Sequence, residues 1–281
     1  MRKRSKSVQV PWPAPTAVVA GILGIGLVLF GFMLPHRSVK ASDPVTVTVT
    51  STPPVEVAKD APPSPPPPPR KVDCTQVPCV ALTFDDGPSA HTAALLDGLA
   101  QLQVKATFFV MGQNVKARPA DVRRAVEEGH AIGGHSWNHT DMKRQTPQAA
   151  CADADRTAQA IQEASGVQTI LVRPPYGSWN QSILAACQGK TFILWDVDTL
   201  DWSTHDGAKI TAHALNDSKP GSILLMHDTV PESIAALPQI VAGLKAKGFE
   251  LVTVPELFNT EIAPGQGIYN GPKNPVVTQD S

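Results

Sequence analysis

The chain has 281 residues, and its 24 Lys and Arg residues nearly balance its 25 Asp and Glu residues. Six of the basic residues precede Asp43, the first acidic residue, so the rest carries 18 basic against 25 acidic residues, about −7. Phosphate binding needs a basic face, so this composition argues against a nucleic-acid partner. Nothing in the sequence indicates a protein partner.

The first 34 residues predict a membrane anchor. Residues 1–16 are basic, which is typical of the cytoplasmic side, and residues 17–34 form an apolar run of 18 residues. At about 1.5 Å per residue this run spans about 27 Å, close to the hydrocarbon thickness of a bilayer. We therefore expect a single-pass protein of the cell membrane, with the bulk of the chain outside. The alternative is a signal peptide cleaved after Ala41 and a secreted protein.

Residues 35–71 form a Pro-rich linker. Proline dominates from Pro53 onward, and the run ends in five consecutive prolines at 65–69. Such a run favours the extended polyproline II conformation. We expect a tether that separates the membrane from a folded domain at 72–260.

Within 72–260, short apolar runs alternate with amphipathic segments. The predicted strands are Cys79–Phe84, Ala106–Met111, Ala131–His135, Ile170–Arg173, Phe192–Val197, Ile223–Met226 and Glu250–Val254. The predicted helices are Thr92–Leu102, Asp121–Glu128, Pro147–Ser165, with Thr146 as its N-cap and Gly166 at its end, and Ile234–Ala246. Residues 261–281 have no apolar period and are expected to be a disordered tail.

This alternation predicts an α/β fold with a parallel sheet, either open or closed into a barrel. Chemically capable residues follow the ends of several predicted strands. In a barrel those ends converge on one face, which favours a single site built from several motifs.

Two adjacent carboxylates, Asp85 and Asp86, follow the first strand and precede a Gly-Pro turn. Neighbouring carboxylates repel, so a cation nearby is expected. His135 and His139 are four residues apart and complete a two-His, one-carboxylate set, which is typical of a catalytic divalent metal. Taken alone, each motif also fits a structural turn or ordinary core histidines.

Arg173 lies beside two prolines and Tyr176 in a stiff segment. It can pair with a carboxylate, and the segment can direct a backbone N–H at a substrate oxygen. His227 emerges from a strand of apolar residues, and either Asp198 or Asp201 can orient its imidazole.

The four cysteines fit an oxidising compartment. We expect the disulfides Cys74–Cys79 and Cys151–Cys187. The alternative is four buried free thiols.

Five motifs occur in order: LTFDDGPS at 82–89, HSWNH at 135–139, RPPYG at 173–177, DTLDW at 198–202 and LLMHD at 224–228. Together they resemble the motifs of the NodB-like polysaccharide deacetylases, carbohydrate esterase family 4, over about 72–258. The resemblance implies an irregular (β/α) barrel of about seven strands, the NodB homology domain, which agrees with the alternation of strands and helices.

The resemblance also implies roles for individual residues. The expected metal ligands are Asp86, His135 and His139, and the metal is zinc, with cobalt as an alternative. The expected catalytic residues are the base Asp85, its partner Arg173, the oxyanion-binding N–H of Tyr176, and the acid His227 with Asp201. The expected substrate-binding residues are Trp202, Leu225 and Pro175.

The implied activity is metal-dependent hydrolysis of N-acetyl groups on a GlcNAc-containing polysaccharide. The predicted anchor and tether favour bacterial peptidoglycan as the extracellular substrate. The alternatives are a chitin or chito-oligosaccharide deacetylase, an acetylxylan esterase and, from another class, a glycan-binding module without turnover. The last would be marked by a lost ligand or base, and none is lost.

Overall fold

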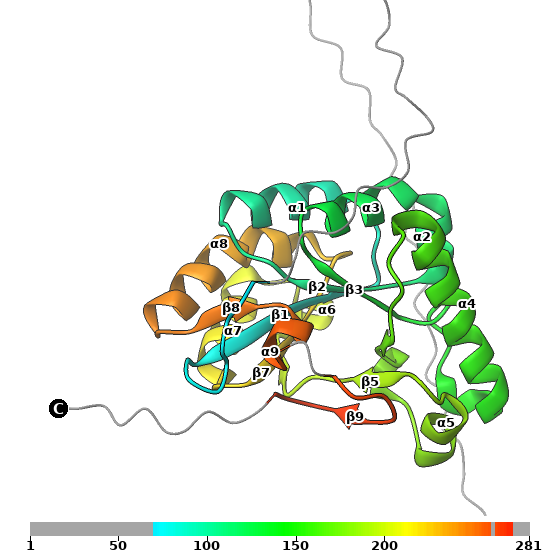
Figure 1. The fold of residues 1–281 in the computed structure, drawn as a ribbon. Helices are drawn as coiled ribbons and strands as arrows, with labels where there is room; N and C mark the ends of the chain where they lie inside the picture. The colour runs from blue at the N-terminus through cyan, green and yellow to red at the C-terminus, as the bar shows by residue number, and fades with distance from the viewer. Residues whose placement is uncertain (1–69, 260–261, 272–281) are drawn as a thin grey trace, which may run out of the picture. The chain divides into compact units, whose positions relative to one another are not determined.

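The computed structural model describes residues 70–259 and 262–271 (Figure 1). The basic N-terminus, the predicted anchor and the linker up to residue 69 lie outside the described residues. Among the helices of 70–259 and 262–271, none has both the length and the apolar composition that a membrane span requires.

The described residues contain one nine-stranded sheet, in the order β6-β7-β1-β2-β3-β4-β5-β9, with β8 paired to β1. All of its strand pairs are parallel. The strands are β1 Cys79–Asp85, β2 Thr107–Val110, β3 Ala131–Gly134, β4 Leu171–Val172, β5 Thr191–Ile193, β6 Val197–Asp198, β7 Ser222–His227, β8 Glu250–Val252 and β9 Gly267–Ile268. The two ends of this order, β6 and β9, do not pair, so the curled sheet is a barrel left open between β6 and β9.

The break between β5 and β6 corrects the predicted strand Phe192–Val197. The chain leaves the sheet at Leu194 because the side chain of Asp196 takes over part of the pairing with β7. Its carboxylate accepts hydrogen bonds from the Ile223 N–H at 2.8 Å and from the Ser222 hydroxyl at 3.0 Å. One predicted strand is therefore two short ones, and the strand count exceeds seven.

Helices cover the outside of the sheet (Figure 1). They are α1 Thr92–Gln101, α2 Gly112–Ala117, α3 Pro119–Glu127, α4 Pro147–Ser165, α5 Gln181–Ala186, α6 Asp201–Thr204, α7 Gly207–Asp217, α8 Pro231–Ala246 and α9 Val254–Leu257, with 3₁₀ turns η1 Met142–Arg144 and η2 Pro175–Gly177. The predicted helix at 147–165 is confirmed with both ends. The Thr146 hydroxyl accepts from the Ala149 N–H at 3.2 Å, and Gly166 takes φ 78°.

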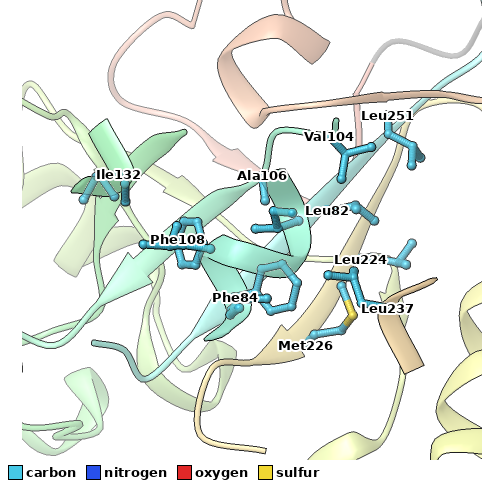
Figure 2. Packing of buried hydrophobic residues seen from close by; sticks show 14 of the residues in the cluster. Leu82, Phe84, Val104, Ala106, Phe108, Ile132, Leu224, Met226, Leu237 and Leu251 are labelled. Atoms are coloured by element: carbon cyan, nitrogen blue, oxygen red, sulfur yellow. The ribbon is translucent and has the colours of Figure 1, made fainter. Parts of the chain in front are cut away.

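The alternating directions of the side chains along β1 determine which of them face the barrel interior. Leu82 and Phe84 point outward into the cluster between sheet and helices, where they lie near Phe108, Leu224 and Met226 (Figure 2). The alternate residues point to the barrel interior, since successive side chains of a strand face opposite sides. Asp85 is therefore an interior side chain at the carboxyl end of the central strand.

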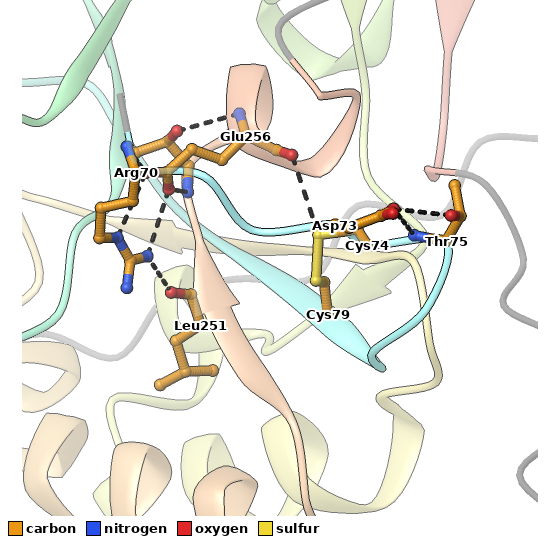
Figure 3. The surroundings of a disulfide bond; sticks show 8 residues. Arg70, Asp73, Cys74, Thr75, Cys79, Leu251 and Glu256 are labelled. Carbon is orange, nitrogen blue, oxygen red and sulfur yellow. Dashed lines mark hydrogen bonds and ion pairs between the residues drawn. A yellow bond between two sulfur atoms is a disulfide. The ribbon is translucent and has the colours of Figure 1, made fainter. Parts of the chain in front are cut away.

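A disulfide joins Cys74 to Cys79 just before β1, as predicted (Figure 3). Nearby, Arg70 contacts Glu256 through its backbone N–H and its guanidinium, each at 3.2 Å, and donates to the Leu251 carbonyl at 2.7 Å (Figure 3). These bonds fix the start of the folded domain against α9 and β8.

The expected disulfide Cys151–Cys187 is not formed. The two thiols are in hydrogen-bond contact between α4 and α5, but both are free. Burial, followed by the contact with Cys151, raises the pKa of the Cys187 thiol. Because the thiolate is the reactive species, the raised pKa lowers the reactive fraction of this thiol.

The expectation of a disordered tail from 261 is wrong for residues 262–271. Gly267 and Ile268 pair with β5, and the Gly271 N–H donates to the Gly221 carbonyl at 2.7 Å. A Cβ at Gly267 would lie 2.4 Å from the Trp179 ring, so glycine permits this close approach. The folded domain thus extends beyond 260, and residues 272–281 lie outside the described residues.

Candidate active site

The carboxyl ends of β1, β3, β4 and β7 meet around one pocket of about 540 Å³. The residues lining it are Asp85, Asp86, His135, His139, Tyr176, Trp195, Asp198, Trp202, His205, Leu225, His227, Thr229 and Val230. The predicted convergence of strand ends therefore brings together residues that lie up to 145 positions apart, from Asp85 to Val230. Arg173 and Asp201 support the pocket from behind, where both are fully buried.

Asp86, His135 and His139 form a candidate metal site. The Oδ1 atom of Asp86 lies 3.6 Å from His135 Nε2 and 3.5 Å from His139 Nε2. Each of the three offers one ligand atom, and these atoms lie within 4.8 Å of one another. Tetrahedral ligands at about 2.0–2.2 Å from zinc stand about 3.4 Å apart, so these spacings fit a cation at their centre.

Two further observations fit a cation. Asp86 Oδ1 is buried and has no hydrogen-bond partner among the described residues, as expected for a ligand atom aimed at a metal. His135 Nδ1 contacts the Arg173 carbonyl at 2.7 Å, which makes Nδ1 the donor and leaves Nε2 as the ligand. Burial lowers the pKa of His135 to about 3, so its imidazole is neutral and able to coordinate.

Asp85 has the environment of a buried base. Its Oδ1 accepts from Arg173 Nη1 at 2.8 Å, and its Oδ2 lies 3.8 Å from His135 Nε2. Burial raises the pKa of Asp85 against the opposing charges of Arg173 and His227. A carboxylate with a raised pKa, held in one orientation, is suited to accept a proton.

Arg173 is itself positioned from several sides. Its guanidinium donates to the Ile193 and Leu194 carbonyls, each at 3.0 Å, and lies 4.1 Å from the Phe109 ring centroid. The two carbonyls lie at the last residue of β5 and directly after it, where the chain leaves the strand. Arg173 therefore satisfies backbone carbonyls at the end of β5 while it orients Asp85.

His227 and Asp201 form a second pair. His227 Nδ1 lies 2.8 Å from Asp201 Oδ1, and Asp201 also accepts from the His227 N–H at 2.7 Å and from the Ser233 hydroxyl. Burial alone lowers the pKa of His227, but Asp201, with Asp85 and Asp86, outweighs this and raises it to about 9. The imidazole is therefore protonated at neutral pH and can act as an acid.

Of the two aspartates that the sequence left open, Asp201 orients His227. Asp198 lines the pocket, but its side chain accepts from the Leu200 N–H at 2.8 Å. Burial alone raises the pKa of Asp201, and the hydrogen bonds from His227 and Ser233 lower it below its ordinary value.

Tyr176 has a left-handed backbone with φ 60°, an uncommon conformation for a non-glycine residue. Its N–H has no hydrogen bond among the described residues, whereas the next two N–H groups donate to Pro174 and Pro175 carbonyls. Its ring packs on His139 with centroids 4.5 Å apart. The arrangement leaves one N–H beside the metal ligands for an external acceptor.

The apolar part of the pocket matches two of the three predicted substrate-binding residues. Leu225 is buried and Trp202 is 56% exposed, and both line the pocket. Pro175 is buried and is not among the lining residues, since the turn η2 directs it into the protein.

Comparisons with known proteins agree with this geometry. Residues 73–191 match the family model described as polysaccharide deacetylase. A peptidoglycan-N-acetylglucosamine deacetylase of Bacillus cereus is 35% identical over 251 residues, which cover 83% of this chain and 89% of that protein. The chain belongs to the polysaccharide deacetylase family.

Two further members of the polysaccharide deacetylase family illustrate its range. The peptidoglycan-N-acetylglucosamine deacetylase PgdA of Listeria monocytogenes is 38% identical over 192 residues, which cover 68% of this chain and only 41% of that protein. A solved structure titled "T48 deacetylase with substrate" is 44% identical with a TM-score of 0.67, over 70% of this chain and 98% of that one. The NodB-like resemblance is thus confirmed, and the chain spans less than half the length of PgdA.

Several residues of this deacetylase site were not identified from the sequence. Trp195, His205, Thr229 and Val230 line the pocket, and Ser233 binds Asp201. Asp228 is fully buried, and its carboxylate accepts from the Ser89 and Thr92 hydroxyls. Asp228 closes the fifth motif, but no role could be assigned to it from the sequence, because its contacts join segments far apart in the chain.

Proposed function

We propose that this protein is a metal-dependent polysaccharide deacetylase that hydrolyses N-acetyl groups of a GlcNAc-containing glycan, with peptidoglycan as its substrate. The observation that carries the proposal is the convergence on one pocket of a three-ligand set, a buried base paired with Arg173 and a protonated His227. The names of the relatives from Bacillus cereus and Listeria monocytogenes support the substrate.

Asp86, His135 and His139 would hold a divalent cation, most simply zinc, because two imidazoles and one carboxylate with open positions suit that metal. The bound cation supplies positive charge and Lewis acidity next to the substrate carbonyl.

The protein groups then divide the proton transfers of amide hydrolysis. Asp85 accepts a proton from the attacking water, and Arg173 keeps its carboxylate aimed at the pocket. The Tyr176 N–H donates a hydrogen bond to the carbonyl oxygen as that oxygen becomes negative. His227 gives its proton to the nitrogen as the C–N bond breaks, so the products are acetate and a glycan with a free amine.

The N-terminal sequence supports a cellular location for this activity. We propose that residues 17–34 anchor the protein in the cell membrane and that residues 35–71 hold the catalytic domain outside the cell. A mature protein that begins at Ser42 would replace this proposal with the alternative, secretion after cleavage.

The test is acetate release by the metal-loaded full chain from peptidoglycan, chito-oligosaccharides and acetylxylan in parallel. We expect release from peptidoglycan and its loss on addition of a chelator. Asp85→Asn is the matched variant, because it keeps the shape of the base and removes its charge. Release from chito-oligosaccharides or acetylxylan alone would reassign the substrate, and no release from any of the three would overturn the function.

A further inference from the structure

His205 lies at the rim of the pocket and has no part in the reaction described above. It follows α6 directly, four residues after Asp201, and takes a left-handed backbone conformation with φ 46° and ψ 37°. Its side chain is 58% exposed, against 13% for His227. A strained non-glycine backbone that presents a polar ring to a pocket is a feature of binding sites.

Glu232 holds the imidazole of His205 from one side. His205 Nδ1 lies 3.5 Å from Glu232 Oε2, an atom that is shielded from solvent and has no hydrogen bond within the described residues. Glu232 belongs to the first turn of α8, which begins four residues after His227. The pair therefore joins the segment that follows Asp201 to the segment that follows His227.

With Nδ1 turned to Glu232, Nε2 is the nitrogen left for an external partner. No hydrogen bond to His205 Nε2 occurs within 70–259 and 262–271. A neutral imidazole with a carboxylate on Nδ1 has its Nε2 as an acceptor, and a protonated one has it as a donor. A sugar hydroxyl can donate a hydrogen bond to the neutral imidazole or accept one from the protonated imidazole.

The rest of the rim also suits a carbohydrate. Tyr176 is 70% exposed and Trp202 is 56% exposed, so an aromatic ring stands on the metal side of the pocket and another on the acid side. No Lys or Arg lines the pocket. His205, with Thr229 and Asp198, is one of the polar residues that line the pocket beside Trp202, and it is the one that carries an exposed imidazole.

We propose that His205 is a substrate-binding residue that recognises the sugar unit next to the one that loses its acetyl group. Its Nε2 hydrogen-bonds a hydroxyl of that unit, and Glu232 fixes the ring for this contact. The inference rests on the proposed function and deepens it, because it assigns recognition of an oligomer, rather than of a single acetylated sugar, to the acid side of the pocket.

The experiment compares four variants of the full chain. His205→Ala removes the contact, and His205→Asn keeps a polar side chain that tolerates the left-handed backbone. Glu232→Gln removes the orienting charge. His213→Ala is the matched control, because His213 is also an exposed histidine beside a carboxylate, Asp217 at 3.2 Å, but does not line the pocket.

Each variant is assayed for acetate release from soluble peptidoglycan fragments, and its affinity for the same fragments is measured by calorimetry in the Asp85→Asn background. We expect His205→Ala to raise KM and the dissociation constant about tenfold, the value of one good hydrogen bond, with kcat changed less than about twofold. His205→Asn should recover part of the affinity, Glu232→Gln should lose less of it than His205→Ala, and His213→Ala should match the unchanged protein.

Two outcomes would overturn this inference while leaving the proposed function intact. The first is an active His205→Ala variant with unchanged KM and affinity. The second is a loss confined to kcat and melting temperature that His205→Asn does not relieve, which is the result of a purely structural ion pair. If the unchanged protein neither binds nor deacetylates any glycan, the proposed function fails and this inference fails with it.

Discussion

Asp85 and His227 are register partners on the neighbouring parallel strands β1 and β7. Because both strands end at these residues, the base and the acid stand side by side on one edge of the sheet. Each has its own buried partner, Arg173 for Asp85 and Asp201 for His227. Hydrolysis requires an ionised base and a protonated acid. The Arg173 guanidinium favours the ionised form of Asp85, and the Asp201 carboxylate favours the protonated form of His227.

Replacement of Asp85 by Asn should reduce kcat by a factor of about 10²–10⁴, the usual contribution of a general base. Metal binding should persist, because Asp85 is not among the three ligand atoms. The melting temperature should fall, since the buried Arg173 loses its ionic partner. Acetate release, metal content and thermal unfolding measure the three effects, and full activity would remove Asp85 from the role of base.

The pH dependence should depend on His227. Its pKa of about 9 in the folded protein lies above the ordinary value, so the acid form is present at neutral pH and is lost as pH rises through 9. The rate should therefore fall on the alkaline side near pH 9. In Asp201→Asn the orienting charge is gone, burial dominates, and the alkaline limb should move to lower pH by at least about one unit. A kcat-against-pH profile in both proteins checks this, and an unmoved limb would separate Asp201 from His227.

Asn114 should matter for metal affinity although it is not a ligand. Its amide donates to the Asp86 carbonyl at 2.9 Å and so supports the left-handed backbone of Asp86, which has φ 70°. Asn114→Ala should weaken zinc binding about tenfold, as loss of a group that positions a metal ligand commonly does. Gln113→Ala, at the exposed neighbouring position, is the control. Competition with a zinc indicator measures both, and equal affinities would count against this support.

The number of free thiols can be measured directly. With Cys74 and Cys79 bonded and Cys151 and Cys187 free, the unfolded, non-reduced protein should contain two reactive thiols. Titration with a chromogenic disulfide reagent in denaturant gives this number. A count of none would restore the Cys151–Cys187 pairing that the sequence suggested, and a count of four would remove the Cys74–Cys79 disulfide.

The sequence predicted the catalytic side chains because they occur in short motifs at the ends of apolar runs. Asp86, His135 and His139 lie in two such motifs, and the structure brings them to one point. The long helix 147–165 was equally accessible, since its cap and its terminal glycine are local signals. These features depend on neighbours along the chain.

The remaining features depend on contacts between distant segments. Ser233 reaches Asp201 across 32 positions, and Asp196 replaces part of a strand ladder only because β7 lies beside it. Strand β9 has two residues and exists because Gly267 admits the Trp179 ring. Such contacts leave no periodic pattern in the sequence. The predictions for residues 262–271 and for the strand Phe192–Val197 were therefore wrong.

The most direct test of this account is a crystal structure of the zinc-loaded protein with the metal located by anomalous scattering. The account predicts one zinc ion at about 2.0–2.2 Å from Asp86 Oδ1, His135 Nε2 and His139 Nε2, with Asp85 beside it and not bound. A zinc ion held elsewhere, or a site in which Asp85 replaces Asp86 as the ligand, would contradict it.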